Sequence, residues 1–314
     1  MNIVFMGTPE FSIPTLTKLY RSHHNVQLVV TQPDRPKGRG RESTPSPVKQ
    51  FALENNIPIL QPKKCTDLEV VKTLGMLNAD FFIVVAFGQI LDKALLALPL
   101  HFCINLHSSL LPKYRGAAPI NWSIINGETE AGITTMKMDV GLDTGDILLA
   151  HKVPINDDDD AQSLHDTLAQ KGSDLVLETL NQFDFGSLEG TSQNIELASY
   201  APKLKKEDGL IQWDQPAVKI HNLVRGLAPW PGAFSFLESK RFKICKTEIK
   251  SCDSPNQPGV ILRISGCGIE VGTQSKKIII TELQPEGKKR MDVKSFLAGH
   301  KLSIGSKFEK QSSL

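Results

Sequence analysis

The chain has 314 residues, more than a single hydrophobic core usually supports, so two domains are expected. Hydrophobic residues make up 40% of it, and no run of about 18 apolar residues occurs, which excludes a membrane span. The net charge of +2 is unevenly distributed along the chain. Residues 1–200 carry 16 Lys+Arg against 23 Asp+Glu, and residues 201–314 carry 20 Lys+Arg against 11 Asp+Glu. A basic second half is typical either of polyanion binding or of a surface with solvated lysines.

The first residues, MNIVFMGTPEF, predict a β-strand and then a helix, not a signal peptide, because no basic segment precedes the apolar run. Thr8 is the expected N-cap of that helix, with Pro9 and Glu10 in its first turn. Only Gly7 stands where a dinucleotide-binding sheet has GxGxxG, so a nicotinamide cofactor is disfavoured. The five cysteines are odd in number and lack CxxC spacing, which argues against disulfides and zinc. We therefore expect a cytoplasmic protein without a metal.

The first half alternates apolar, β-branched runs with helical segments. The runs NIVFMG, VQLVVTQ, ADFFIVVAFG and FCINLH predict a Rossmann-like parallel sheet covered by helices. Two further β-like stretches, GITTMKM and DILLAHKVPI, precede an acidic run at 157–160, which is expected to cap a helix near 163–180. Residues 1–185 are thus one predicted domain, and residues 186–203, rich in Gly, Ser and Thr, a linker.

Residues 204–314 are the second predicted domain. They contain one helix-like stretch, opened by Asp214, followed by the short strands AFSFLE, RFKICKTEI, GVILRI, GIEVGT and KIIITEL. Strands of this length and spacing predict a small β-barrel of the OB-like, oligonucleotide-binding type. The fold class is therefore α/β, with a Rossmann-like parallel sheet in the N-terminal domain and a C-terminal β-barrel.

A polar cluster, CINLHSS, ends the fourth apolar run. Alternation along a strand points Asn105 and His107 to one face, and the carboxyl end of such a strand meets the ligand crevice of an α/β sheet. An amide donor beside an imidazole suits acyl transfer, because the amide can stabilise an oxyanion and the imidazole can donate or move a proton. An isolated pair of this kind more often satisfies strand-end backbone groups, so its surroundings must decide.

The surrounding residues favour catalysis. In SLLPKYRGAAP a proline and a glycine force a turn, and Lys113 and Arg115 are expected to place positive charge beside the crevice. In MDVGLDTGD two glycines form a tight loop that can present Asp143 to His107, holding the imidazole tautomer or raising its basicity. A carboxylate that only stabilises the turn is the alternative.

The combination of NLHSSLLPKYRGAAPI with MDVGLDTGD resembles the active-site signature of the 10-formyltetrahydrofolate-dependent formyltransferases. The resemblance extends to MGTPEFS, TQPDRPKGRGR and PSPVK near the start and to APWPGAF in the second half. It implies that Asn105, His107 and Asp143 are the catalytic set and that 10-formyltetrahydrofolate is the co-substrate. The SLLP turn, the segment 85–91 and the start of the Asp143 loop are the implied folate contacts: Ser109, Leu110, Leu111, Pro112, Val85, Phe87, Gly88, Ile90, Leu91, Met138 and Asp139.

The segment DRPKGRGR concentrates four cations in eight residues and is expected to be an exposed loop. Alone it could be a merely solvated loop. By resemblance it enters the acceptor arm of tRNA, and together with the basic second half it implies that initiator methionyl-tRNA is the acceptor and that the domain 204–314 binds tRNA. The implied contacts are Arg35, Lys37, Arg39, Arg41, Lys203, Lys205 and Lys206. A monomer is expected.

Three rival functions share some of these features. A formyltransferase that acts on a sugar nucleotide or a purine precursor would carry the same trio but would not need DRPKGRGR or a basic second domain. A tRNA-binding or folate-sensing protein without turnover would not need the complete trio. An oxidoreductase of formylated folate would need a dehydrogenase domain, for which this chain has no room. Two positions depart from the usual family pattern: Phe87, where Tyr is frequent, and Asn121-Trp122, where Gln and another residue are common.

Overall fold

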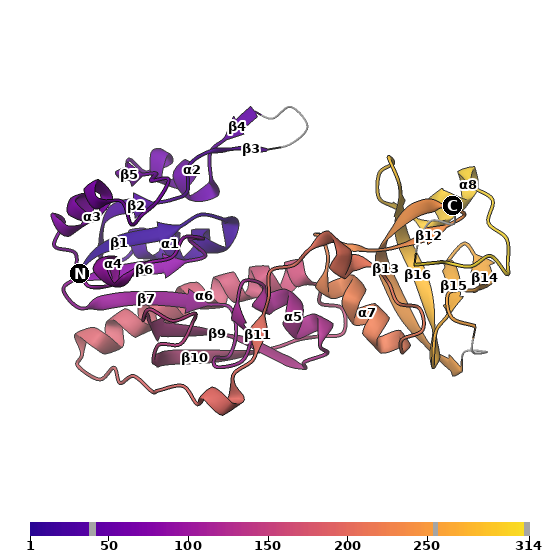
Figure 1. Cartoon of the computed structure of the whole chain (residues 1–314). Coiled ribbons are helices and arrows are strands. Elements are labelled where there is room, and N and C mark those ends of the chain that lie inside the picture. Colours follow the sequence, from indigo (N-terminus) through magenta and orange to yellow (C-terminus); the bar gives the residue numbers. More distant parts are fainter. Residues whose placement is uncertain (38–41, 254–256, 311–314) are drawn as a thin grey trace. The chain divides into compact units, whose positions relative to one another are not determined.

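The computed structural model describes residues 1–37, 42–253 and 257–310 and divides into two compact units (Figure 1). The first unit comprises Met1–Pro119, Glu130–Pro154 and His165–Ala201. The second comprises Ile120–Thr129, Ile155–Leu164 and Pro202–Leu314. The chain therefore contributes two short internal segments to the second unit before its C-terminal part enters it. None of the described helices is long and apolar enough to cross a membrane.

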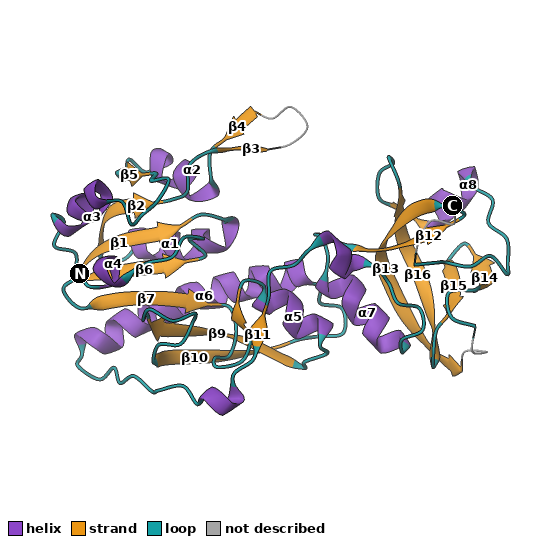
Figure 2. Ribbon diagram, viewed as in Figure 1, coloured by secondary structure: helices purple, strands orange, loops and turns teal. Residues whose placement is uncertain are grey.

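A seven-stranded sheet forms the centre of the first unit, in the order β10-β9-β7-β6-β1-β2-β5 (Figure 2). Five strands pair in parallel, while β9 pairs antiparallel with both β7 and β10. The predicted Rossmann-like sheet is confirmed, and an antiparallel hairpin extends it beside β7. The strands are β1 (Asn2–Gly7), β2 (Asn25–Val30), β5 (Ile59–Leu60), β6 (Phe81–Val85), β7 (Phe102–His107), β9 (Glu130–Lys137) and β10 (Ile147–Pro154).

Side chains from β7 pack against both faces of the sheet. Cys103 belongs to a buried apolar cluster that includes Phe82 and Leu95. On the opposite face α6 approaches closely, since a Cβ added to Gly172 would lie 2.6 Å from the side chain of Leu106. The alternation expected of a strand is therefore observed along β7. The helices are α1 (Ile13–Tyr20), α2 (Pro47–Glu54), α3 (Leu68–Gly75), α4 (Lys93–Leu96), α5 (Pro119–Ile125) and α6 (Ala161–Asp184).

The first helix begins later than the sequence predicts. A 3-10 turn, η1 (Glu10–Ser12), precedes α1, and Thr8 caps neither of them. The Thr8 hydroxyl instead donates to the backbone oxygen of Phe87 at 3.0 Å. The Thr8 oxygen accepts a hydrogen bond from the backbone nitrogen of Gln32 at 3.4 Å. The predicted N-cap is wrong because this hydroxyl bonds backbone groups of two distant segments instead of the start of a helix.

The acidic run before α6 has the structural role predicted for it. Asp160 Oδ1 accepts hydrogen bonds from the backbone nitrogens of Gln162 and Ser163, both at 2.9 Å. These are the unpaired donors of a helix start, so the carboxylate stabilises the first turn. Arg225 in turn donates to the backbone oxygens of Asn156 and Asp159, both at 2.9 Å.

The basic segment contains a short hairpin. Strand β3 (Arg35–Lys37) pairs antiparallel with β4 (Glu42–Thr44). The predicted loop is wrong for these residues, because their backbone groups pair across two strands. Arg39 and Arg41 lie outside the described residues.

The second unit contains an antiparallel sheet in the order β12-β13-β16-β15-β14, with β17 paired to β16. The predicted strands are confirmed. Among the described residues β12 and β14 do not pair with each other; isolated bridges join Phe236 to Glu309 and Val260 to Lys307, so the last described segment touches both edges. The strands are β12 (Ala233–Leu237), β13 (Lys240–Asp253), β14 (Ile261–Ser265), β15 (Gly268–Gly272), β16 (Lys276–Pro285) and β17 (Met291–Asp292).

Two helices, α7 (Ala217–Gly226) and α8 (Val293–Gly299), accompany this sheet. The helix expected to open at Asp214 begins three residues later, because Pro216 occupies its N-cap and disfavours helical backbone in the residue before it. The shared apolar core includes Ile220, Phe242 and Phe296. This core makes the second unit a compact body of its own.

The segment predicted as a linker contains ordered structure. Strand β11 (Tyr200–Ala201) pairs in parallel with β8 (Arg115–Gly116), and two 3-10 turns, η2 (Ile195–Leu197) and η3 (Lys206–Gly209), flank it. The backbone nitrogen of Arg115 also donates to Ser199 O at 2.8 Å. Residues 186–201 therefore pack against the part of the first unit in which the chemistry was predicted.

Candidate active site

Asn105 and His107 lie on one face of β7, at its carboxyl end, between β6 and β9. Asn105 pairs with Val84 on one side and Met136 on the other. His107 is buried, with 6% of its surface exposed, and Asn105 is half-buried. Within the described part of the chain the Asn105 amide makes no side-chain hydrogen bond. Its donors are therefore not engaged by another described side chain or backbone group.

The ring of His107 is oriented by backbone. Its Nε2 lies 3.0 Å from the backbone oxygen of Tyr114, and because a carbonyl can only accept, Nε2 carries the proton. Nδ1 lies 3.8 Å from Asp143 Oδ2. The Tyr114 carbonyl thus sets the tautomer, and Nδ1 is the ring atom that faces the carboxylate.

Asp143 occupies a strained position in the loop that joins β9 to β10. Its φ is 53°, a left-handed value that Asp tolerates better than most residues, and its Oδ2 accepts a hydrogen bond from the backbone nitrogen of Gly116 at 2.8 Å. Gly145 is required two residues later, since a Cβ there would lie 1.8 Å from Lys137 O. Asp139 supports the loop internally, because its Oδ1 accepts from Thr144 Oγ1 at 2.7 Å.

Three consecutive residues connect these groups. Tyr114 holds His107 through its carbonyl and Gly116 holds Asp143 through its backbone nitrogen. Between them, Arg115 is only 2% exposed and donates to Gln193 Oε1 from Nε at 3.1 Å and from Nη2 at 2.7 Å. The Arg115 guanidinium is therefore buried and bonded to Gln193, and it does not stand as an exposed positive charge.

Gln193 is a residue that sequence reasoning missed. It lies in the stretch interpreted as a linker, 78 positions from Arg115, and its Nε2 donates to the backbone oxygens of Asp143 at 2.9 Å and Gly145 at 2.7 Å. No motif marks such a residue in one sequence, since its role depends on a long-range contact.

The SLLP turn is fixed by one hydroxyl. Thr134, which is fully buried, donates to Ser109 O at 2.7 Å and accepts from the backbone nitrogen of Leu111 at 3.3 Å. Ser109 Oγ donates to Lys113 O at 2.6 Å, which closes the turn from within. Ser109 and Leu111 are buried, whereas Leu110 and Pro112 are half-buried and so remain accessible.

Replacing Thr134 with valine is expected to destabilise the protein by about 1–3 kcal/mol, because a buried carbonyl and a buried backbone nitrogen lose their partner without a change of side-chain shape. Denaturant unfolding measures the loss. Thr134→Ser is the matched control, since it keeps the hydroxyl, and it should recover most of the stability. Equal destabilisation by the two variants would show that the methyl group, not the hydroxyl, matters here.

The segment 85–91 follows β6, the parallel neighbour of β7. Gln32 Nε2 donates to the backbone oxygens of Phe87 at 3.0 Å and Gly88 at 2.9 Å. Phe87 and Leu91 belong to the same apolar cluster as Cys103, and Met138 packs against it. The segment therefore shares a packed cluster with the strand that carries Asn105. Because Phe87 and Leu91 are buried, they can offer a ligand mainly backbone, while Ile90 is 84% exposed.

The residues expected to contact tRNA occur in both units. Arg35 is exposed and donates to Gln32 Oε1 at 2.5 Å, and for Lys37 the structure describes the backbone in β3. A hydrogen bond from Lys49 lowers the pKa of Asp34, at the base of the hairpin, below its ordinary value. Lys203, Lys205 and Lys206 are exposed. The structure therefore leaves Arg35 and these three lysines accessible.

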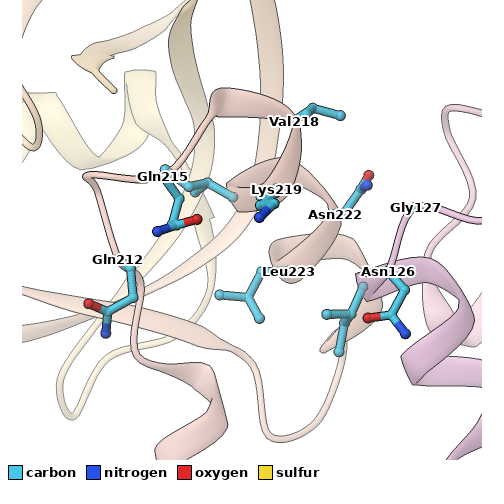
Figure 3. Close-up of a pocket in the computed structure, with 10 residues that line it drawn as sticks. Asn126, Gly127, Gln212, Gln215, Val218, Lys219, Asn222 and Leu223 are labelled. Atoms are coloured by element: carbon cyan, nitrogen blue, oxygen red, sulfur yellow. The ribbon is translucent and has the colours of Figure 1, made fainter. Parts of the chain in front are cut away.

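A separate pocket of about 580 Å³ lies within the second unit (Figure 3). Its lining combines amide side chains, a lysine and apolar residues, and includes Asn126, Gln212, Gln215, Lys219, Asn222 and Leu223. None of the candidate catalytic residues contributes to it.

Asn121 and Trp122, which depart from the usual family pattern, both have hydrogen-bond partners in the second unit. Asn121 Nδ2 donates to Gly226 O and Trp122 Nε1 donates to Pro202 O, both at 2.8 Å.

The chain matches known protein families and relatives over nearly its full length. A family model described as "Formyl transferase" matches residues 1–180, and one described as "Formyl transferase, C-terminal domain" matches residues 203–301. The chain is 53% identical to a protein named methionyl-tRNA formyltransferase from Citrifermentans bemidjiense, over 97% of this chain and 95% of that one. It is 52% identical to a protein of the same name from Geobacter sulfurreducens, over 98% of this chain and 96% of the relative.

Solved structures with the same fold include two transferases at low sequence identity. WlaRD, described as a sugar 3N-formyl transferase in the presence of dTDP and 5-N-formyl-THF, superposes with a TM-score of 0.68 at 21% identity, covering 92% of this chain and 99% of its own. An N-formyltransferase from Helicobacter canadensis in complex with folinic acid and dTDP-3-aminofucose gives a TM-score of 0.66 at 20% identity, covering 90% and 98%. These likenesses establish the fold.

Proposed function

Because the chain belongs to the formyl transferase family, we propose that it transfers the formyl group of 10-formyltetrahydrofolate to the α-amine of initiator methionyl-tRNA. The observation that carries the proposal is the approach of Asp143 to His107, with Nδ1 and Oδ2 3.8 Å apart, at the end of the strand that also bears Asn105. The choice of acceptor is supported by relatives about half identical over nearly the full chain, all named for methionyl-tRNA.

The reaction forms a bond between the amine nitrogen and the formyl carbon and breaks the bond from that carbon to N10 of the folate. The amine loses a proton and the leaving N10 gains one. The Asn105 amide donates to the oxyanion that develops on the formyl oxygen. His107 exchanges a proton through Nδ1, since Nε2 is occupied by the Tyr114 carbonyl. Asp143 stabilises the protonated ring or accepts the proton of the amine.

The folate is expected to lie along the SLLP turn and the segment 85–91. Both are held rigidly by protein hydrogen bonds, from Thr134 in the turn and from Gln32 in the segment. Pre-organised backbone of this kind can orient a planar ring system at low entropic cost. Met138 and Asp139, at the start of the Asp143 loop, would complete the contact.

The acceptor tRNA is expected to use the basic parts of the chain. The domain 204–314 would bind its body, together with Lys203, Lys205 and Lys206, and residues 1–185 would carry out the chemistry. Residues 201–314 hold 20 Lys+Arg against 11 Asp+Glu, which supports the first assignment. We place the enzyme in the cytoplasm and expect it to act as a monomer.

The acceptor is tested by direct competition between substrates. The protein is incubated with 10-formyltetrahydrofolate and, in separate reactions, with methionyl-tRNA, free methionine or an amino-sugar nucleotide, and the transferred formyl group is followed by mass. Formylation of methionyl-tRNA alone is the expected result. Transfer only to free methionine or only to the sugar would contradict the proposed acceptor, and binding of folate without transfer to any of them would contradict an enzyme.

The basic segment 34–41 gives a separable prediction. The double variant Arg35→Ser with Arg39→Ser is expected to raise KM for methionyl-tRNA by about tenfold. The slope of log affinity against log salt concentration should become shallower by the equivalent of about two phosphate contacts. Turnover on a minimal methionyl acceptor should stay unchanged. Lys63→Ser with Lys64→Ser, at two exposed lysines before α3, removes the same charge and is the matched control. An equal rise in KM in both doubles would indicate general charge instead of a specific contact.

A further inference from the structure

Gln193 connects a buried arginine to the loop that carries Asp143. We propose that it is a positioning residue for the formyl transfer: it fixes the backbone of Asp143, and through it the distance between that carboxylate and His107. The inference rests on the proposed function for its activity readout and on the hydrogen bonds of one amide for its physical basis.

Every hydrogen-bonding position of the Gln193 side chain is used. Nε2 donates to Asp143 O at 2.9 Å and Gly145 O at 2.7 Å, while Oε1 accepts from Nε and Nη2 of Arg115 at 3.1 and 2.7 Å. An amide has two donors and one oxygen with two lone pairs, so the group is saturated. A flipped amide would set its NH2 against the guanidinium and its oxygen against two carbonyls. The orientation is therefore determined by its partners.

Burial of the Arg115 guanidinium costs folding free energy. Its side chain is buried, Nη1 has no hydrogen-bond partner, and no carboxylate pairs with it among the described residues. A buried cation held by a neutral amide contributes little to stability compared with an apolar side chain of the same size. Its location points to a role in the site, because the residues on either side of Arg115 bind His107 and Asp143.

The Asp143 loop has little apolar packing of its own. Val140 and Leu142 are 74% and 61% exposed, and Asp143 has a positive φ that an unsupported loop would relax. Gly116 holds the carboxylate and Gln193 holds the backbone that bears it. Loss of the backbone contact would let the carboxylate move relative to His107 without removing either group.

Two substitutions of Gln193 distinguish its contact with the Asp143 loop from its role as hydrogen-bond acceptor for Arg115. Gln193→Glu keeps an acceptor for Arg115 but sets a second oxygen against the two loop carbonyls, whereas Gln193→Ala removes both contacts. We expect both to lower kcat for methionyl-tRNA by about 10- to 100-fold, as misplacement of a reacting group does. KM for either substrate should stay within about threefold of wild type. Gln170→Ala, on the exposed surface of α6, is the matched control and should match wild-type turnover.

A double-mutant cycle identifies the residue through which Gln193 acts. In an Asp143→Asn background, Gln193→Ala should lower kcat further by less than about threefold, because the carboxylate it positions is already gone. Wild-type kcat for Gln193→Glu, or a full additional loss in the Asp143→Asn background, would overturn the proposal. If Gln193→Ala does not fold, Gln193→Glu alone, in both backgrounds, decides. All rates are compared with wild type, whose failure to formylate methionyl-tRNA would contradict the proposed function instead.

Discussion

Replacing Asp143 with asparagine is expected to lower kcat by about 10²- to 10⁴-fold with little change in the melting temperature. The amide oxygen of asparagine can still accept the hydrogen bond from Gly116, and asparagine tolerates the φ of 53° as aspartate does. What the variant loses is the negative charge that faces His107 Nδ1 across 3.8 Å and the capacity to take a proton. Steady-state kinetics with both substrates and thermal unfolding measure the two quantities.

The control for this variant lies in the same loop. Asp146→Asn makes the same chemical change at a carboxylate that accepts a hydrogen bond from Ser192 Oγ at 2.9 Å and does not touch His107. It should leave kcat within about twofold of wild type, as expected for a surface substitution away from the chemistry. Near-normal turnover of a folded Asp143→Asn variant would remove Asp143 from the catalytic set.

The sequence was most informative where local periodicity decides structure. Strand alternation placed Asn105 and His107 on one face of β7, and the buried runs predicted all the parallel strands except the two-residue β5, a short edge strand without a run of its own. Glycine spacing indicated a tight loop at Asp143, where Gly145 is sterically required. These features depend on neighbours in the sequence and can be interpreted from it.

Prediction failed where distant segments compete for the same side chain. Thr8 has the sequence context of an N-cap, but its hydroxyl donates to Phe87 O and accepts from Gln32 N. Arg115 was expected to place positive charge beside the crevice, but its side chain is buried and bonded to Gln193. In each case a partner about 80 positions away in the sequence determines the role of the side chain. Neither composition nor spacing can predict such a partner.

The same competition sharpens the role of His107. Asp143 was expected to hold the tautomer of His107 or to raise its basicity, and the Tyr114 carbonyl accounts for the first of these tasks. Asp143 is thereby left to act on charge and proton transfer instead of ring orientation. This division of tasks is the reason that a neutral amide at position 143 should preserve the geometry of the site and still abolish most of its activity.

Replacing Asn105 with alanine is expected to lower kcat by about 10²- to 10³-fold, the usual effect of removing one oxyanion donor. KM should change little, because the donor acts on charge that develops only in the transition state. The stability should also change little, since the amide has no side-chain hydrogen bond within the described residues. Single-turnover kinetics, which isolate the chemical step, give the clearest measurement.

Asn105→Asp distinguishes donation from shape. Aspartate has nearly the same volume as asparagine but presents a negatively charged acceptor where the amide presents a donor, so it opposes the developing oxyanion. Its kcat should fall at least as far as that of Asn105→Ala if Asn105 stabilises negative charge. If the side chain only fills space at the end of β7, the aspartate variant should retain activity that the alanine variant loses. That order of activities would assign Asn105 to packing and remove it from the catalytic set.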